Sequence, residues 1–469
     1  MDSKSSRSMG FAKTITFIAT VLLLTGVQPL FAQLNQGQDT VLTLEKCRRM
    51  GWKHDQNLRA EKKQTVAYGE QASSAKKDRL PQLDGIGSYQ YLGEAQGIQL
   101  GNVPVISPDG MVVGYVPGSD LALANHHFYQ GGLELNQPLF LGNRLRNNQR
   151  RFSALEKQGL TRENIRINDL TLEIDTDYWD VISSKELLIL AKKNEKLLAQ
   201  LVENIQNRYE AQVVSKNDLL MAQVRHNESK LELIRSNNRL KLSKIKLNQI
   251  LGADIDASFA FVDSITVKLE KTDPDKDYIE QANGNRPEID YLNMQLSIHD
   301  LTEKLTKGKY LPSLSVGVSG YYARPNPELR PEGGFNWSAG ASLSIPIYRW
   351  NKRRNDLNYD MLQKNKSELA LEKTREYIAL EVKQAIFNLN ESYEKVKIAE
   401  FSLTQADENL RVSKENYEVS LVSILALLDA QTYWQEAYAT FITSKAEYRL
   451  NQTKLERALG VLVNDYGKR

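Results

Sequence analysis

The chain repeats itself at a fixed spacing of 208 residues. Similar residue pairs recur at this spacing over more than a hundred positions. They are Leu172-Glu173 and Leu380-Glu381, Tyr209-Glu210 and Tyr417-Glu418, Val214-Ser215 and Val422-Ser423, and Leu251-Gly252 and Leu459-Gly460. A chance resemblance between heptads would drift, so the constant offset indicates a duplication with a period well outside those of short solenoids. We therefore expect two halves of similar structure.

The offset changes upstream of these pairs. Leu80-Pro81-Gln82-Leu83 matches Leu311-Pro312-Ser313-Leu314 at a spacing of 231 rather than 208, so the first half carries 23 extra residues. The extra residues fall in 93–127, which is rich in Gly, Pro and Asp. This composition predicts a long loop.

Period-two alternation predicts strands in both halves. Apolar residues alternate with Ser and Gly in 313–322 and 336–348, and with Gln, Glu and Asn in 129–136. One face of each strand is therefore apolar and the other is small or polar. This pattern fits a barrel with lipid outside and water inside, and it also fits a soluble hairpin with one face on a core.

Two segments predict helices longer than a globular core requires. Residues 148–208 contain no Pro and a single Gly, Gly159, and residues 352–417 contain neither. At about 1.5 Å per residue, sixty residues reach roughly 90 Å. Apolar residues recur at spacings of three and four, which indicates a coiled-coil seam. The long helices must reverse near 210–217 and 418–425.

The strand count limits what one chain can build. Each half supplies a strand hairpin, and four strands cannot close a water-filled barrel. Either several chains share one barrel or there is no barrel. Three chains would give twelve strands.

The N-terminus has the pattern of an export signal. Lys4, Arg7 and Lys13 precede an apolar run, and cleavage after Ala32 would remove them together with Asp2. The net charge would fall by two, from +3 to about +1. Such a balance gives no reason to expect nucleic acid as a partner.

The sequence holds no signature of an enzyme or a metal site. It lacks the Gly-x-Ser-x-Gly, His-Glu-x-x-His and Gly-x-x-x-x-Gly-Lys motifs, and its five histidines form no ligand cluster. We therefore predict no catalytic residue, no cofactor and no metal. Cys47 is the only cysteine and cannot form an intrachain disulfide, so we expect a small core residue on a helix.

Taken together, these features resemble the TolC-type outer-membrane efflux protein family over nearly all of 41–460. The resemblance rests on the opening Leu42-Thr43-Leu44-Glu45, the Leu-Pro-x-Leu before each odd strand, and Pro138 and Pro346 at the end of each even strand. It rests also on 209–223, on 417–431 and on the closing Ala458-Leu459-Gly460.

The resemblance implies an α+β fold with duplicated halves. Three chains would form a twelve-stranded outer-membrane β-barrel, four strands from each, on a long periplasmic α-helical coiled-coil barrel. The homotrimer would be the exit channel of a tripartite efflux pump or a type I secretion system. Its partners would be a periplasmic adaptor, an inner-membrane transporter and outer-membrane lipid. The alternative is a non-porous periplasmic coiled-coil scaffold.

The expected domain organisation follows the duplication. A signal peptide (1–32) precedes a first repeat (33–252) with a strand hairpin at about 82–137, and a linker (253–272). A second repeat (273–460) with a strand hairpin at about 313–346 and a C-terminal tail (461–469) complete the chain. The loop within 93–127 is expected to be exposed outside the cell and dispensable for assembly.

The resemblance also implies roles at the helix tips. A link between Asp218 and Tyr417 would help to hold the tip closed. Asp429 would be one of two acids that ring the entrance, the other being replaced by Ala426. The expected adaptor contacts are Gln212, Val213, Val214, Ser215, Ser420, Leu421, Val422 and Ser423.

The tips also depart from the family pattern. A basic tip residue is replaced by Val422, which puts the closed-state network in doubt. Glycine, usual in both turns because it tolerates positive φ, is replaced by Gln212 and Ser420, so we expect the turns to differ.

A cluster of basic residues follows each even strand. It would either lie at the inner-leaflet headgroups or form a solvated first helical turn. Its members are Arg144, Arg146, Arg150, Arg151, Lys352, Arg353 and Arg354.

Overall fold

The computed structural model describes residues 41–462 except 94–96, 100, 118–119, 123–125, 262–264, 274–275 and 327–331. For 97–99 and 120–122 it describes the backbone alone. The predicted signal peptide and residues 463–469 of the predicted tail lie outside the described residues. The residues from Leu42 onward form one compact unit.

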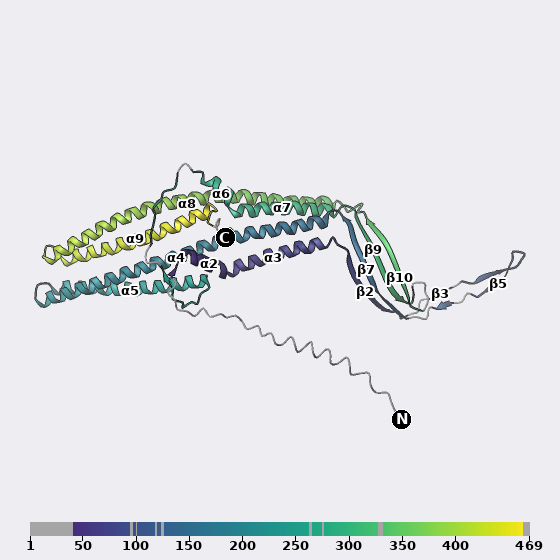
Figure 1. Cartoon of the computed structure of the whole chain (residues 1–469), viewed down its shortest axis with the longest axis horizontal. Coiled ribbons are helices and arrows are strands. Elements are labelled where there is room, and N and C mark those ends of the chain that lie inside the picture. The colour runs from purple at the N-terminus through teal and green to yellow at the C-terminus, as the bar shows by residue number, and fades with distance from the viewer. Residues whose placement is uncertain are drawn as a thin grey trace, which may run out of the picture. The chain divides into compact units, whose positions relative to one another are not determined.

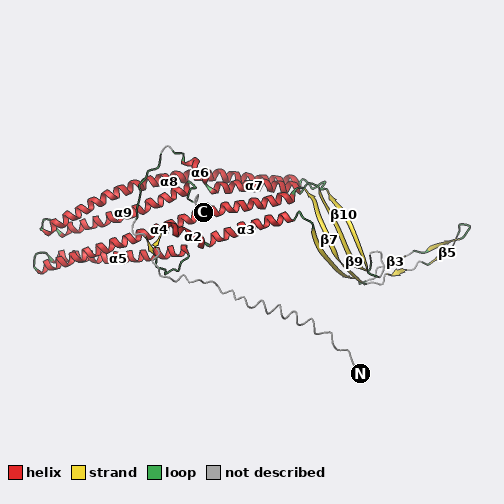
Figure 2. Cartoon of the chain, viewed as in Figure 1, coloured by secondary structure: helices red, strands yellow, loops and turns green. Residues whose placement is uncertain are grey.

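Figures 1 and 2 show the helices and strands of the two halves. The first half contains β1 (Val41–Leu42), α2 (Leu44–His54), α3 (Gln56–Lys77), β2 (Gln82–Tyr91), β3 (Gly97–Gln99), β4 (Val103–Ile106), β5 (Val112–Val116), β6 (Asp120–Ala122), β7 (His127–Leu141), α4 (Arg144–Glu210) and α5 (Lys216–Leu251). After β8 (Ala260–Phe261), the second half contains α6 (Tyr278–Asn285), α7 (Pro287–Gly308), β9 (Ser313–Arg324), β10 (Gly334–Ser344), α8 (Lys352–Glu418) and α9 (Ile424–Ala458).

The helix lengths confirm the duplication. α4 and α8 have 67 residues each, and both of their ends differ by the 208-residue offset. At 1.5 Å per residue each spans about 100 Å. α3 and α7 have 22 residues each and differ by the other offset, 231.

Local sequence signals set the helix ends. The side chain of Asp55 accepts the N–H of Leu58 at 2.6 Å and caps α3. Pro287 opens α7, where its missing N–H costs nothing. Gly252 and Gly460 follow α5 and α9 with φ of 69° and 70°, the left-handed conformation that ends helices.

The four long strands form one antiparallel sheet in the order β10-β9-β7-β2. The halves therefore join at the β7–β9 pair, and β2 and β10 are the edge strands. β10 ends at Ser344, earlier than the 348 expected from alternation. Pro138 lies inside β7 rather than at its end, where the register with β9 shifts between Pro138 and Phe140. A bulge suits proline because it has no N–H to donate to the ladder.

The segment 93–127 corrects the prediction of a long loop. It contains two further antiparallel pairs, β3 with β6 and β4 with β5. Composition alone was misleading because β4 and β5 are rich in valine and contain Pro104 and Gly114 within them.

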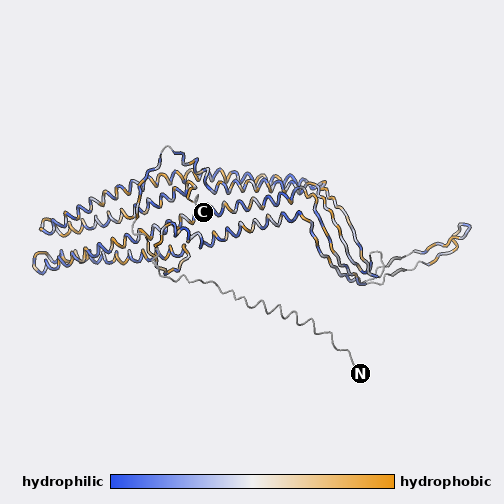
Figure 3. The backbone as a smooth tube through the Cα atoms, in the orientation of Figure 1, coloured by the Kyte–Doolittle hydropathy of each residue, from blue (hydrophilic) through white to orange (hydrophobic). Residues whose placement is uncertain are grey.

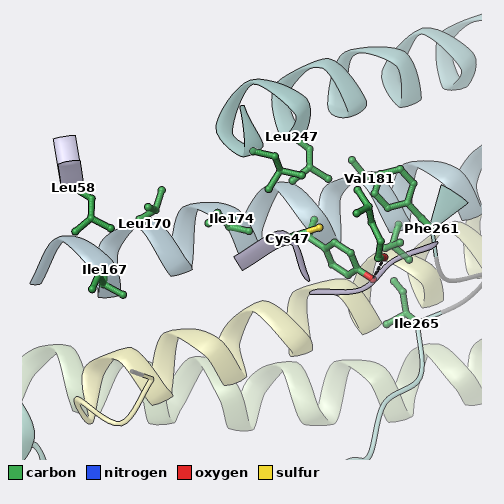
Figure 4. Close-up of a cluster of buried hydrophobic side chains, with 13 residues drawn as sticks. Cys47, Leu58, Ile167, Leu170, Ile174, Val181, Leu247, Phe261 and Ile265 are labelled. Atoms are coloured by element: carbon green, nitrogen blue, oxygen red, sulfur yellow. Dashed lines mark hydrogen bonds between the residues drawn. The ribbon is translucent and has the colours of Figure 1, made fainter. Parts of the chain in front are cut away.

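The helices pack in pairs around α4. α4 contacts α3, α5, α7 and α9, while α8 contacts α7 and α9. One buried cluster lies between α2, α4 and α5 and includes Cys47 and Val181 (Figure 4). The expectation for Cys47 is confirmed, since it is fully buried on α2. Burial and then the charge of Asp175 raise the pKa of its thiol to about 12.

A glycine allows α3 and α4 to approach closely. A Cβ atom on Gly159 would lie 2.6 Å from the Oγ1 of Thr65 on α3. That distance is shorter than van der Waals contact, so any side chain at 159 would push the two helices apart.

A buried carboxylate joins the two halves. Asp175 on α4 is fully buried and accepts two hydrogen bonds from Arg48 of α2, from Nε at 2.8 Å and from the terminal nitrogen at 2.5 Å. It also accepts the hydroxyl of Thr453 on α9 at 2.8 Å. Burial lowers the pKa of Arg48, but these bonds outweigh it and raise that pKa above its ordinary value. The Asp175 carboxylate therefore joins α2 to α4 through the ion pair and joins α4 to the second half through the bond from Thr453.

Candidate functional site

The four-stranded sheet has two chemically different faces. Residues that are directly opposite in antiparallel strands share a face, so the register assigns every position. One face carries Leu83, Tyr89, Tyr91, Tyr129, Leu133, Leu135, Leu314, Val316, Val318, Tyr322, Phe335, Trp337, Ala339, Ala341 and Leu343. The other carries Gln82, Asp84, Ser88, Gln130, Glu134, Asn136, Ser313, Ser315, Ser319, Asn336, Ser338, Ser342 and Ser344.

The aromatic residues of the apolar face gather toward the strand ends that are remote from the helices. The rings of Tyr89 and Tyr129 lie 5.2 Å apart, and Tyr322 and Trp337 occupy the corresponding region of β9 and β10. Strands of ten or more residues are long enough to cross the apolar band of about 25 Å that a barrel presents to lipid. Aromatic side chains are favoured where this band meets the polar headgroups.

The polar face is suited to water. Asp84 lies directly opposite Glu134, a pair of like charges that is unfavourable unless it is well solvated. The hydroxyls of Ser319 and Ser338 lie 2.9 Å apart and share a hydrogen bond. This face also carries Ile86, Phe128 and Tyr321, so the apolar residues are concentrated on the other face without being confined to it.

At the other end of the long helices, the two tip turns have the same geometry. In the first, the N–H groups of Gln212 and Val213 donate to the carbonyls of Tyr209 and Arg208 at 2.9 and 2.8 Å. In the second, those of Ser420 and Leu421 donate to the carbonyls of Tyr417 and Asn416 at 3.0 and 2.8 Å. These paired bonds are the Schellman ending of a helix.

The replacement of glycine does not change these turns, contrary to expectation. Gln212 and Ser420 have φ of 60° and 64°, the left-handed conformation that glycine would adopt. The Schellman bonds hold the backbone there, at a cost of about 1–2 kcal/mol for a residue with a Cβ.

A serine caps the helix that leaves each turn. Ser215 accepts the N–H of Asp218 at 3.2 Å, and the carboxylate of Asp218 accepts the N–H of Ser215 at 3.1 Å, a complete capping box. Ser423 accepts the N–H of Ala426 at 3.3 Å. Ala426 cannot return the bond, so the two turns differ in charge although their backbones match.

The predicted bond between Asp218 and Tyr417 is not made within one chain. The carboxylate of Asp218 bonds to its own cap, and the buried hydroxyl of Tyr417 has no hydrogen-bond partner among the described residues. The role of this pair in a closed tip stays a prediction. Asp429 is half-buried on α9, and no described group bonds its carboxylate.

Arg208 connects the two tips, and the sequence reading missed it. Its guanidinium donates to the carbonyl of Glu418 at 3.1 Å and lies 5.2 Å from the ring centroid of Tyr417. A cation at the end of α8 complements the partial negative charge of the helix C-terminus. The available signal was that Arg208 is the only basic residue in the last turn of either long helix.

Each turn also exposes one apolar side chain at the same place. Val213 and its repeat partner Leu421 are 62% and 74% exposed. Val214 and Val422 are half-buried and pack against the cluster of buried residues between the tips. The tips thus present an apolar contact surface.

The basic residues after the even strands begin α4 and α8. The Nε of Arg144 donates to the carbonyl of Leu141 at 3.1 Å, and Lys352 lies 3.7 Å from Asp356. These contacts tie two of the cations to the junction between sheet and helices. These contacts are compatible with both interpretations of the cluster, a position at the inner-leaflet headgroups and a solvated first helical turn.

None of the described helices is both long and apolar enough to cross a membrane. Among the same residues, no three His, Cys, Asp or Glu side chains come together in a way that could hold a metal ion.

The sequence matches one protein family over both halves. The model of the family described as outer membrane efflux protein covers residues 52–253 and 278–461. Outer membrane protein TolC of Escherichia coli is 21% identical over 310 residues, 62% of this chain and 62% of that protein. The match thus spans less than two thirds of that relative's length. Solvent efflux pump outer membrane protein SrpC of Pseudomonas putida is 22% identical over 411 residues, 87% of this chain and 83% of that protein.

Solved structures share the fold. The CmeC outer membrane channel of Campylobacter jejuni superposes with a TM-score of 0.71 at 16% identity, covering 89% of this chain and 86% of CmeC. The predicted α+β fold with duplicated halves is therefore confirmed.

Proposed function

Because the chain belongs to the outer membrane efflux protein family, we propose that three copies form the exit channel of a tripartite efflux pump or a type I secretion system. The family places the chain in the outer membrane. Its members are efflux proteins, and we propose that this chain has no catalytic activity of its own.

The observation that carries the proposal is that the strand contact between the halves is made only once per chain. β7 of the first half pairs with β9 of the second. The equivalent pair, β10 with β2, cannot form within the chain because these strands are the two edges of the sheet. The same contact between neighbouring copies would pair both edges and build a closed ring.

The helices show the same incomplete symmetry. Leu190 of α4 and Ile442 of α9 are buried in one cluster, 4% and 1% exposed. Their repeat partners, Ile398 of α8 and Ile234 of α5, are 66% and 58% exposed. Equivalent positions of the two halves therefore differ in exposure: the contact between α4 and α9 buries one pair, and the chain covers the equivalent pair on α8 and α5 with nothing among its described residues. We infer that α8 of one copy packs on α5 of the next.

Each of these exposed residues belongs to a stripe that runs along its helix on the side opposite the chain's own core. On α5 the stripe is Leu220, Val224, Leu231, Ile234, Leu242 and Ile245. On α8 it is Tyr359, Leu362, Leu369, Tyr377, Leu380, Phe387, Ile398, Phe401 and Val412.

Three copies give twelve strands, which is enough for a barrel with a water-filled lumen. The apolar face would contact outer-membrane lipid, and the polar face with Asp84 and Glu134 would line the lumen. A non-porous scaffold would need neither a two-faced sheet nor unpaired edge strands of this length.

The proposal is tested by location, assembly and conductance of the full chain. We expect it in the outer-membrane fraction, as a trimer in mild detergent, and as a pore in planar bilayers. Recovery as a periplasmic monomer would rule out the channel.

The gate forms a second part of the proposal. A closed tip would give the unpartnered hydroxyl of Tyr417 a bond to an Asp218 carboxylate, a charge-assisted bond of about 1.5–3 kcal/mol when partly dry. Tyr417→Phe or Asp218→Ala should therefore raise conductance, with little further gain in the double variant. Within one chain the hydroxyl of Tyr417 makes no hydrogen bond to a described residue, so Tyr417→Phe should leave the stability of the single chain unchanged. Wild-type conductance in both variants would show that other contacts close the tip.

Asp429 serves as the control for this gate, because its proposed role is charge in the lumen. Asp429→Ala should weaken block by divalent cations without raising the basal conductance. An increase in basal conductance would instead make Asp429 part of the gate.

The apolar tips are proposed to dock the periplasmic adaptor, which in turn contacts the inner-membrane transporter. Val213→Asp together with Leu421→Asp places six charges on this surface of a trimer and should abolish capture of an adaptor after crosslinking in cells. Ser420→Gly is the matched control, since it keeps the left-handed turn and the apolar surface. Undiminished capture by the aspartate variant would move the docking surface away from the tips.

A further inference from the structure

The two-stranded ribbon β4–β5 has an apolar surface that no described residue covers. Val103 lies opposite Val116 and Pro104 opposite Tyr115, with a shift in register after Val105. Eight large apolar side chains of the ribbon are between 42% and 72% exposed: Val103, Val105, Ile106, Met111, Val112, Val113, Tyr115 and Val116. Figure 3 shows the hydrophobic residues along both of its strands.

Both faces of this ribbon are apolar. Val103, Val105 and Val116 project from one face, and Pro104, Ile106 and Tyr115 from the other, because neighbours along a strand alternate. The only charged residue from 103 to 116 is Asp109, in the turn. A ribbon that simply extended into water would carry polar residues on at least one face.

Such a ribbon needs a partner. An isolated two-stranded hairpin is marginally stable in water, and β4 and β5 each have a second edge that pairs with no described strand. Free edges and a continuous apolar surface favour pairing with another chain.

The nearest available partner is the same ribbon in the other copies. The ladder between β2 and β7 ends with Leu92, whose N–H donates to the carbonyl of His126 at 2.9 Å. Ten residues lie between Leu92 and Val103, and the eleven residue steps limit the reach of the ribbon to roughly 40 Å from the barrel rim. Three ribbons tethered to one rim would have an effective concentration in the millimolar range.

Charge and geometry favour contact among these copies. The strands carry no charge, so the ribbons do not repel one another. The edge of β4 in one copy can pair with the edge of β5 in the next, a head-to-tail contact that closes after three copies. Pairing would cover the edges, and the inward faces would bury one another.

We propose that the three β4–β5 ribbons of a trimer assemble into a six-stranded apolar cap over the outer mouth of the channel. The proposal rests on the trimer proposed above. It assigns a role to the 23 residues by which the first half exceeds the second. Assembly of the trimer does not depend on the cap, since the helix and strand interfaces lie outside it.

The first test is crosslinking of Val105→Cys in detergent-purified trimers with a short bismaleimide. The buried thiol of Cys47 should not react, so the reagent reports position 105 alone. We expect covalent dimers, one per trimer, because each thiol reacts with a single maleimide group and the reagent carries two. The matched control adds Val103→Glu and Val116→Lys, an opposite-charge pair that supports the ribbon but removes its apolar face, and crosslinking should be lost.

The second test replaces 103–116 by a short Gly-Ser turn. Trimers should persist, and their conductance in planar bilayers should rise because the cap is gone. Intact trimers that neither crosslink at position 105 nor gain conductance would overturn the cap and leave the channel standing. Loss of trimers in the deletion variant alone would overturn a cap that is dispensable for assembly, whereas absence of trimers in the unmodified chain would overturn both proposals.

Discussion

Ile234→Asp and Ile398→Asp are each expected to abolish the trimer while leaving the single chain folded. Both side chains are exposed in the chain, so an aspartate there costs the monomer little. In the proposed trimer each lies between α5 of one copy and α8 of the next. An unpaired buried charge costs on the order of 3–5 kcal/mol, and a three-fold assembly contains three of them. Size-exclusion chromatography with light scattering, together with circular dichroism, measures both outcomes.

The control for this experiment is Arg235→Gln. It makes the same change in net charge on α5, at an exposed position whose repeat partner, Thr443 of α9, is also exposed. Trimers should be retained. Loss of trimers in the control as well would mean that net charge, rather than the stripe, governs assembly. Retention in all three variants would show that α5 and α8 do not meet between copies.

Asp175→Ala should give the largest loss of stability of any change within one chain. It leaves the guanidinium of Arg48 without its ion pair and the hydroxyl of Thr453 without its acceptor. Breaking a buried pair in this way costs about 3–5 kcal/mol. Thermal unfolding of purified protein should show a markedly lower midpoint, and limited proteolysis should cut between the halves earlier.

A double replacement separates the charge from the packing. Arg48→Met with Asp175→Leu removes both charges and fills a similar volume, so it should recover most of the lost stability, because well-packed apolar residues often replace buried pairs without loss. Val66→Ala on the exposed face of α3 is a neutral reference. A double variant as unstable as Asp175→Ala would show that the bonds themselves, and not the stranded charge, hold the halves together.

The sequence by itself determined the architecture of the chain. The constant 208-residue offset predicted two halves, and α4 and α8 indeed begin and end 208 residues apart. The absence of proline from 148–208 and 352–417 predicted the long helices, because backbone hydrogen bonding within a helix needs only local sequence. Alternation predicted the two faces of the sheet for the same reason, since successive strand side chains point to opposite sides.

Sequence patterns did not predict the features that depend on backbone geometry or on contacts between residues far apart in the chain. The turns at Gln212 and Ser420 keep a glycine-like conformation because the paired Schellman bonds enforce it, which residue type alone does not show. The valine-rich strands within 93–127 were hidden among turn formers. Arg208 reaches Glu418 across 210 positions of sequence, and no local pattern relates the two.

Only the tertiary structure revealed which repeat partners are covered. Ile234 and Ile442 are identical residues at equivalent positions, and no sequence rule distinguishes them. Within one chain α4 packs on α9, but α5 and α8 lie on the outer sides of the two halves and do not pack on each other. Burial depends on which surfaces meet in space, so the unpaired stripes, the free edges of β2 and β10 and the uncovered β4–β5 ribbon emerged only from the fold.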